Sequence, residues 1–284
     1  MPTAPLSPSA LAALMMVTSG AAHAIVNAIF KSGGDKMAGR AMIDGSSACL
    51  VLPLAFFVPL PGAAWPWLAG SLATHLVYLL CLIRAFEAAD MSAVYPVMRG
   101  SAPVIAAVGS VAVLGEPMTW AIGAGVLLVS LGTLLVALRN APPLHALGWA
   151  LLTGASIAAY TVIDASGVRA APETLSYIAW NFMATGFGVG GFFAIRRGSA
   201  FFREARAQWR PGLAAGSLSI VSYGCALGAY RLGNVARLAG LRETSIVFGL
   251  VIAALFLHER VNRMRALGGA VIALGAGVLI VLGQ

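Results

Sequence analysis

The chain alternates long apolar runs with short breaks that carry proline, glycine or charge. A transmembrane helix needs about 20 mostly apolar residues. Measured against that length, the pattern predicts an all-α integral membrane protein with ten transmembrane helices and no soluble domain between them. The predicted ranges are 9–31, 41–60, 65–86, 91–114, 118–138, 145–166, 173–195, 211–230, 234–257 and 264–283.

One stretch returns at about half the length of the chain. AVYPVMRGSAPVIAAVGSVAVLGEPMTW at 93–120 recurs, altered, as ARLAGLRETSIVFGLVIAALFLHERVN at 236–262, which aligns Arg99 with Arg242 and Glu116 with Glu259. Five helices per half is an odd number, so equivalent helices must cross the membrane in opposite directions. The sequence therefore predicts two inverted five-helix repeats, 1–140 and 141–284, an architecture of many secondary transporters.

Composition and charge agree with a membrane protein. The chain is 60% hydrophobic and only 10% charged, with a formal net charge of +8. Its arginines lie between apolar runs, the pattern of membrane loops, and nucleic acid is not an expected partner. Three basic residues fall on the side of the predicted termini and thirteen on the other side. Positive loops face the cytoplasm, so we expect a bacterial-type inner (plasma) membrane protein with both termini extracytoplasmic.

The motifs of several other protein classes are missing. There is no HExxH and no phosphate loop GxxxxGK[ST], and the four histidines are scattered without metal-ligand spacing. We expect no enzyme activity, no metal and no cofactor. The partners expected are a small-molecule solute and the lipid bilayer, in a monomer or weak homodimer joined through GxxxG pairs. Cys49, Cys81 and Cys225 each stand inside an apolar run and are interpreted as small buried hydrophobic residues.

Two segments carry a resemblance to a known family. LGEPMTWAIGAGVLLVSLGTLL at 114–135 and LHERVNRMRALGGAVIALGAGVLIVL at 257–282 resemble the drug/metabolite transporter superfamily, in its EamA-type branch. The second segment departs from the family pattern at His258, where glycine is usual. The resemblance implies a secondary carrier, and YddG-like aromatic amino-acid exporters are one neighbourhood within it. Many relatives are drawn with cytoplasmic termini, which conflicts with the charge distribution of this chain.

The function predicted is a secondary transporter of small metabolites, most strongly an exporter of aromatic or hydrophobic amino acids by alternating access. A multidrug or nucleotide-sugar-like carrier is the alternative, and a purely structural membrane protein is less favoured. Arg99 and Arg242 lie roughly 12 Å into their helices, near the midplane of a bilayer core about 30 Å thick. Each is expected to bind the carboxylate of a solute or to pair structurally with another side chain.

Further polar and aromatic side chains recur at central depths of the predicted helices. Together with the two arginines, the candidate substrate-binding residues are His75, Tyr78, Tyr95, Tyr160, Trp180, Asn181, Tyr223 and Ser245. Any one of them could instead serve ordinary packing. His23 and His75 are candidates for proton coupling, since histidine titrates near neutral pH.

Three residues of one predicted helix, Pro96, Gly100 and Pro103, predict a kink, which is either a hinge for alternating access or inert packing. Glu116 and Glu259 each stand before a new helix and are interpreted as helix caps.

Overall fold

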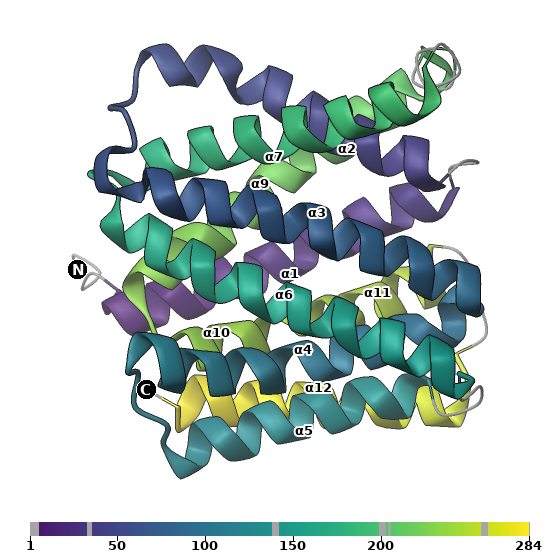
Figure 1. Ribbon diagram of the computed structural model, residues 1–284. Helices are drawn as coiled ribbons and strands as arrows, with labels where there is room; N and C mark the ends of the chain where they lie inside the picture. The colour runs from purple at the N-terminus through teal and green to yellow at the C-terminus, as the bar shows by residue number, and fades with distance from the viewer. Residues whose placement is uncertain are drawn as a thin grey trace.

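A computed structural model describes residues 6–32, 36–137, 142–198, 203, 206–256 and 261–283. This part of the chain is 89% helical and contains no strand. The helices lie alongside one another in a bundle, with both chain ends at the same end of the molecule (Figure 1). The fold class predicted from the apolar runs is therefore confirmed as all-α.

The helices follow the predicted ranges closely. In the first half they are α1 (Pro8–Ser32), α2 (Lys36–Val51), α3 (Trp65–Ala88), α4 (Met91–Leu114) and α5 (Trp120–Ala137), with two short 3₁₀ turns, Leu52–Phe56 and Gly62–Ala64. In the second half they are α6 (Leu144–Ala170), α7 (Thr174–Arg197), α9 (Trp209–Leu232), α10 (Val235–Arg242), α11 (Thr244–Leu255) and α12 (Arg263–Val281).

Length and composition identify eight segments of the described chain as able to cross a membrane. They are α1, α3, α4, α6, α7, α9, the α10–α11 segment and α12, while α5 is apolar but shorter and α2 does not qualify. Large apolar side chains such as Leu144 and Val281 are exposed on the outer surface, as expected where hydrocarbon replaces water. The protein is thus a multi-pass membrane protein, and the ten-helix count stays a prediction.

The predicted helix over 41–60 is wrong in its bounds. α2 begins at Lys36 and ends at Val51, where the 3₁₀ turn containing Pro53 follows. A proline lacks the N–H that would continue the helix and disfavours helical geometry in the residue before it. The hydropathy pattern missed the start of α2 because Arg40 looked like a loop residue. Inside the helix Arg40 instead pairs with Asp44, one turn later.

The predicted helix over 234–257 is broken in the middle. α10 ends at Arg242 and α11 begins at Thr244, with Glu243 between them in a tight turn whose N–H donates to the carbonyl oxygens of Gly240 and Leu241. α4, which carries Pro96 and Pro103, is one continuous helix. The interruption therefore falls in the helix without proline.

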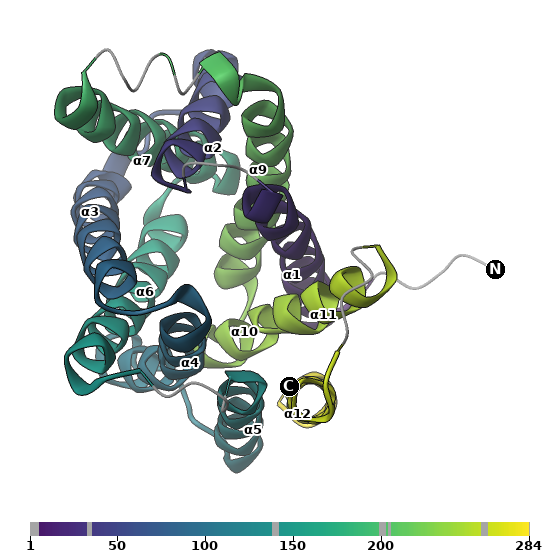
Figure 2. The same ribbon diagram turned by 90° about the vertical axis from the view of Figure 1, so that its right-hand side faces the viewer.

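The strongest helix pairings each join the two halves of the chain. α5 packs on α12, α1 on α9, α3 and α4 on α6, and α2 on α7, and Figure 2 shows these helices arranged around the middle of the bundle. Exchanging each helix for its counterpart in the other half turns α1–α9 into α6–α3, and it turns α4–α6 into the contact of α1 with α10 and α11, which is also present. The main apolar core also draws on both halves. The inverted repeat over 1–140 and 141–284 remains a prediction, which this pattern supports.

One cysteine differs from its prediction. Cys81 is buried and Cys225 is half-buried, but Cys49 is exposed on the outer surface of α2, where it lines an apolar groove with residues of α7. The outer surface of a transmembrane helix faces hydrocarbon and not water, so exposing a small apolar side chain there costs no hydrophobic free energy.

Candidate functional site

A cavity of about 150 Å³ lies inside the bundle. Its walls come from α1, α2, α3, α4, α6, α7, α9 and α10. The lining residues of α1 and α3 belong to the C-terminal halves of these helices, and those of α2 and α4 to the N-terminal parts. These parts of the four helices lie toward the end of the molecule remote from the termini (Figure 1), so the lining residues extend from the middle of the molecule toward that end.

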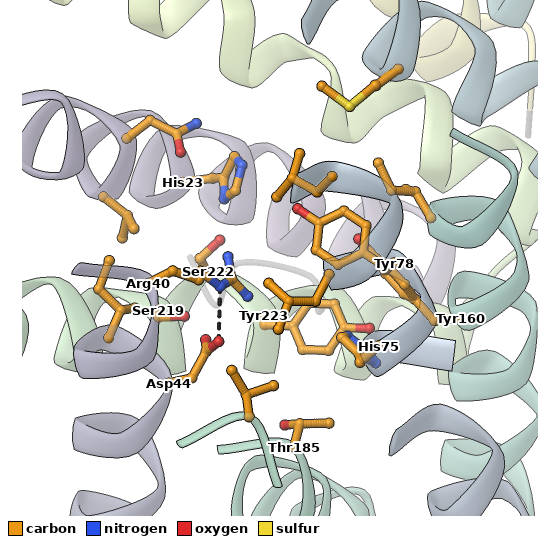
Figure 3. Close-up of a pocket in the computed structure, with 18 of the residues that line it drawn as sticks. His23, Arg40, Asp44, His75, Tyr78, Tyr160, Thr185, Ser219, Ser222 and Tyr223 are labelled. Carbon is orange, nitrogen blue, oxygen red and sulfur yellow. Dashed lines mark hydrogen bonds and ion pairs between the residues drawn. The ribbon is translucent and has the colours of Figure 1, made fainter. Parts of the chain in front are cut away.

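Aromatic rings form one side of the cavity (Figure 3). The imidazole of His75 stacks on the ring of Tyr160, with 4.2 Å between ring centroids. Tyr78 and Tyr223 meet Tyr160 edge-on, and Phe182 meets Tyr223 in the same way. Edge-to-face and offset arrangements suit the charge distribution of aromatic rings, so the cluster is stable without a ligand and presents ring faces to the cavity. We call these five residues the aromatic cluster.

Arg99 is held by the partner half of the chain. Its guanidinium lies 3.1 Å from a carboxylate oxygen of Glu243 and donates to the Ser245 hydroxyl at 3.1 Å. The side chains of Arg99 and Glu243 are 7% and 4% exposed. The break between α10 and α11 is what brings Glu243 inward, opposite α4. Arg99 is thus a neutralised charge at the cavity wall.

Arg242 is in a different electrostatic state. It is buried and lines the cavity, and its guanidinium carbon lies over the ring of Tyr223, 5.0 Å from the centroid. Among the described residues, its side chain forms no ion pair and donates no hydrogen bond, and its Nε is buried without a partner. The interaction free energy of a cation with an aromatic face is smaller than that of a guanidinium with a hydrogen-bonded carboxylate. Arg242 therefore leaves hydrogen-bond donors available to an anion.

Asp164 is a functional-site residue that the sequence reasoning missed. It is fully buried in α6 and accepts hydrogen bonds from the hydroxyls of Tyr177 and Tyr223 and from the amide of Asn181. The Asn181 amide also reaches Ser71, whose hydroxyl is 3.3 Å from Nδ1 of His75. This network lies behind the aromatic cluster and fixes it. An acidic residue inside a predicted transmembrane helix was the signal that could have found it.

Arg40 and Asp44 were also missed, because Arg40 was counted in a loop. In α2 they form an ion pair with 2.8 Å between Nε and a carboxylate oxygen, and both line the cavity beside His23 (Figure 3). The pair brings α2 into the cavity wall.

The candidate residues predicted from sequence divide into two groups. Those that line the cavity are His23, His75, Tyr78, Tyr95, Arg99, Tyr160, Tyr223 and Arg242. Three others do not: Trp180 packs edge-on against Trp65, Asn181 binds Asp164 behind the cavity, and Ser245 accepts from Arg99. Contacts with neighbouring side chains hold these three residues outside the cavity lining, and the substrate-binding role of every residue in both groups stays a prediction.

The predicted hinge residues all lie in α4. A Cβ on Gly100 would stand 2.9 Å from Cγ of Leu134 in α5, so the glycine permits close packing of these helices. The hinge role of Pro96, Gly100 and Pro103 stays a prediction.

Charged contacts join several helices at the end of the molecule that holds the termini. Glu116 forms an ion pair with Arg169 at 2.6 Å, and its other oxygen accepts from the N–H of Val235, the first residue of α10. Arg169 also donates to the carbonyl oxygens of Tyr230 and Gly233. Glu116 thus caps α10 of the other half, not the helix that follows it in sequence, so that interpretation was wrong in its partner. Glu259 lies outside the described residues.

In the described part of the chain, no group of three or more His, Cys, Asp or Glu side chains lies close enough together to hold a metal ion.

Comparison with known proteins finds one family match and similar solved structures. No curated protein sequence matches the chain. A solved structure named only "Crystal structure of protein" superposes with a TM-score of 0.75 at 18% identity, covering 97% of this chain and 98% of the other, which shows a shared fold. Residues 144–281 match the EamA-like transporter family. The match spans most of the second half of the chain, which is therefore similar to a family of transporters.

Proposed function

We propose that this protein is a secondary carrier that exports aromatic or hydrophobic amino acids by alternating access. The observation that carries the proposal is Arg242, a buried guanidinium that lines the cavity and lacks a carboxylate partner among the described residues. A guanidinium binds a carboxylate through two parallel hydrogen bonds, which supplies both affinity and orientation. The α-carboxylate of an amino acid is the ligand that fits this group.

The rest of the cavity favours an apolar or aromatic side chain on that solute. The aromatic cluster lies directly beside Arg242, since Tyr223 belongs to both. Apolar residues such as Leu79, Leu82 and Met98 extend the same wall. Small-molecule sites are typically apolar with a few convergent polar groups. Among the described cavity residues, Arg99 is paired with Glu243 and Arg40 with Asp44, so Arg242 is the one arginine without a carboxylate partner, whereas a phosphorylated solute would favour several.

The alternating-access part of the proposal is supported by the asymmetry between the two ends of the bundle. The cavity extends toward the end remote from the termini, while the ion pair of Glu116 and Arg169 ties α6 and the α9–α10 connection together at the other end. The symmetric set of helix pairings supports an inverted repeat, in which the two halves exchange roles as the open end changes. The charge distribution supports a cytoplasmic position for the open end, from which an exporter would take its solute.

Solute flux into proteoliposomes that contain the purified protein tests this function. We expect uptake of phenylalanine, tyrosine or leucine, and none of a nucleotide sugar or a cationic drug. The measurement is run with and without a pH gradient. Flux that the gradient does not change means facilitated diffusion, whereas gradient-driven flux means proton exchange, for which His23 and His75 at the cavity wall are the first groups to test.

The panel also contains the outcome that contradicts the proposal. Transport of cationic drugs without amino acids would remove the role of Arg242 as a carboxylate ligand, and empty liposomes are the baseline for every solute.

A further inference from the structure

The ion pair of Arg40 and Asp44 is a further charged feature of the cavity, beside Arg242 and the pair of Arg99 and Glu243, and the inference drawn from it rests on the proposed function. Both residues stand on α2 one turn apart, and both line the cavity. Only one contact joins them, from Nε of Arg40 to Oδ2 of Asp44 at 2.8 Å. Among the described residues, the two Nη groups of Arg40 donate no hydrogen bond and Oδ1 of Asp44 accepts none.

The unused atoms of this pair are complementary to one chemical group. In a zwitterionic amino acid, the carboxylate and the ammonium are attached to the same carbon, so its two charges lie as close together as those of Arg40 and Asp44. The Nη groups can donate to the carboxylate, and Oδ1 can accept from the ammonium. Neither a simple carboxylate nor a simple amine uses both atoms.

The setting of the pair argues against a merely stabilising role. Arg84 and Glu87 on α3 form a comparable intrahelical ion pair at 3.1 Å, but their side chains are 63% and 59% exposed and neither lines the cavity. The side chains of Arg40 and Asp44 are 35% and 13% exposed, and His23, Ser219 and Ser222 line the cavity with them (Figure 3).

We propose that Arg40 and Asp44 form a subsite for the zwitterionic head group of the solute, distinct from Arg242. Arg40 lies near the N-terminal end of α2, at the end of the molecule toward which the cavity extends. A solute that enters from this end meets the pair before it reaches Arg242 in the α10 segment. The subsite thus selects amino acids over aromatic carboxylates and amines during entry.

Inhibition of phenylalanine flux in proteoliposomes tests the subsite. The competing solutes are phenylalanine itself, 3-phenylpropionate, which lacks the ammonium, and phenethylamine, which lacks the carboxylate. In Asp44→Asn we expect the KM for phenylalanine to rise about tenfold, the loss of one charge-assisted hydrogen bond. The inhibition constant of 3-phenylpropionate should stay within about twofold, because that solute makes no contact with Oδ1.

Two further variants complete the design. Arg40→Gln should weaken phenylalanine and 3-phenylpropionate together and leave phenethylamine unchanged. Glu87→Gln, which breaks the exposed pair on α3, should alter none of the three. If Asp44→Asn does not fold in detergent, Asp44→Glu keeps the carboxylate and should retain the preference for phenylalanine over 3-phenylpropionate.

The outcomes separate the subsite from the proposed function. Equal weakening of all three solutes in Asp44→Asn, or no change at all, would overturn the subsite while amino-acid transport by the unaltered protein stands. If the unaltered protein moves no amino acid in the panel, the proposed function fails and the subsite fails with it.

Discussion

The arginines of the cavity differ in how their charges are balanced. Arg99 faces Glu243 across the two halves of the chain, Arg40 faces Asp44 within one helix, and Arg242 faces only the ring of Tyr223. Removing one partner of a buried ion pair destabilises the folded protein, because the other charge stays behind in a medium of low dielectric constant. All three residues are arginines, yet substituting each of them should have a different effect on stability and transport.

Arg99→Ala and Arg242→Ala are therefore expected to fail in different ways. Arg99→Ala leaves Glu243 buried without its cation and should lower stability by about 3–5 kcal/mol, seen as a lower midpoint of thermal unfolding in detergent. Arg242→Ala removes a charge that has no counter-ion among the described residues, so the midpoint should change little while amino-acid flux falls at least about tenfold.

The double variant Arg99→Ala/Glu243→Ala is the matched control for this pair. Removing both charges should recover most of the unfolding midpoint that Arg99→Ala loses. Unchanged flux in a folded Arg242→Ala protein would contradict the carboxylate-binding role of that side chain.

At this scale the sequence predicted which residues are unusual but not how they pair. Arg99, Arg242 and the tyrosines stand out because polar groups are costly in an apolar run, and most of them line the cavity. The partner of Arg99 is Glu243, which lies in the other half of the chain and which no local spacing indicates. Asp164 was overlooked because its three donors come from other helices. Tertiary partners depend on packing that periodicity does not encode.

Among the elements, the helices form where the apolar runs predict them. The errors in helix bounds occur where an ion pair neutralises a charged side chain in or beside an apolar segment. Arg40 enters α2 because Asp44 neutralises it, and α10 separates from α11 because Glu243 turns toward Arg99. Hydropathy records the average composition of a segment, so it misses such individual compensations. The two prolines of α4 predicted a kink, which stays a prediction, and the segment that breaks is the counterpart of α4, between α10 and α11.

Close helix contact through glycine gives a test at the level of one helix pair. α5 and α12 cross at Gly132, where an added Cβ would lie 2.8 Å from the carbonyl oxygen of Gly268 and from Cγ1 of Ile272. Gly132→Ala should therefore destabilise the protein by about 1–3 kcal/mol, because backbone cannot yield as a flexible side chain can. The measurement is the midpoint of thermal unfolding in detergent.

Gly123 provides a matched control in the same helix. An added Cβ there would meet no atom within 4 Å. Gly123→Ala should leave the midpoint unchanged or raise it slightly, since alanine favours helix by about 1 kcal/mol over glycine. If the two variants behaved alike, the contact between α5 and α12 would not be the close one described.

For the whole molecule, orientation in the membrane decides which way the cavity opens. The basic residues gather at the end remote from the termini, for example in the last turn of α7, where Arg196 and Arg197 lie. Positively charged loops are retained in the cytoplasm. The cavity extends toward that same end. If the orientation predicted from the basic residues is wrong, the side of the membrane to which the cavity opens is reversed as well.

Cysteine labelling in intact cells tests this orientation. Cys49, Cys81 and Cys225 are first replaced by alanine, and a single cysteine is then placed at Ser7 before α1 or at Glu87 near the end of α3, both exposed. A membrane-impermeant maleimide should label Ser7→Cys in intact cells and Glu87→Cys only after the membrane is opened. The reverse pattern would place the termini in the cytoplasm, as drawn for many relatives. The cavity would then face outward in this structure, and Arg40 and Asp44 would bind an exported solute as it leaves the protein instead of as it enters.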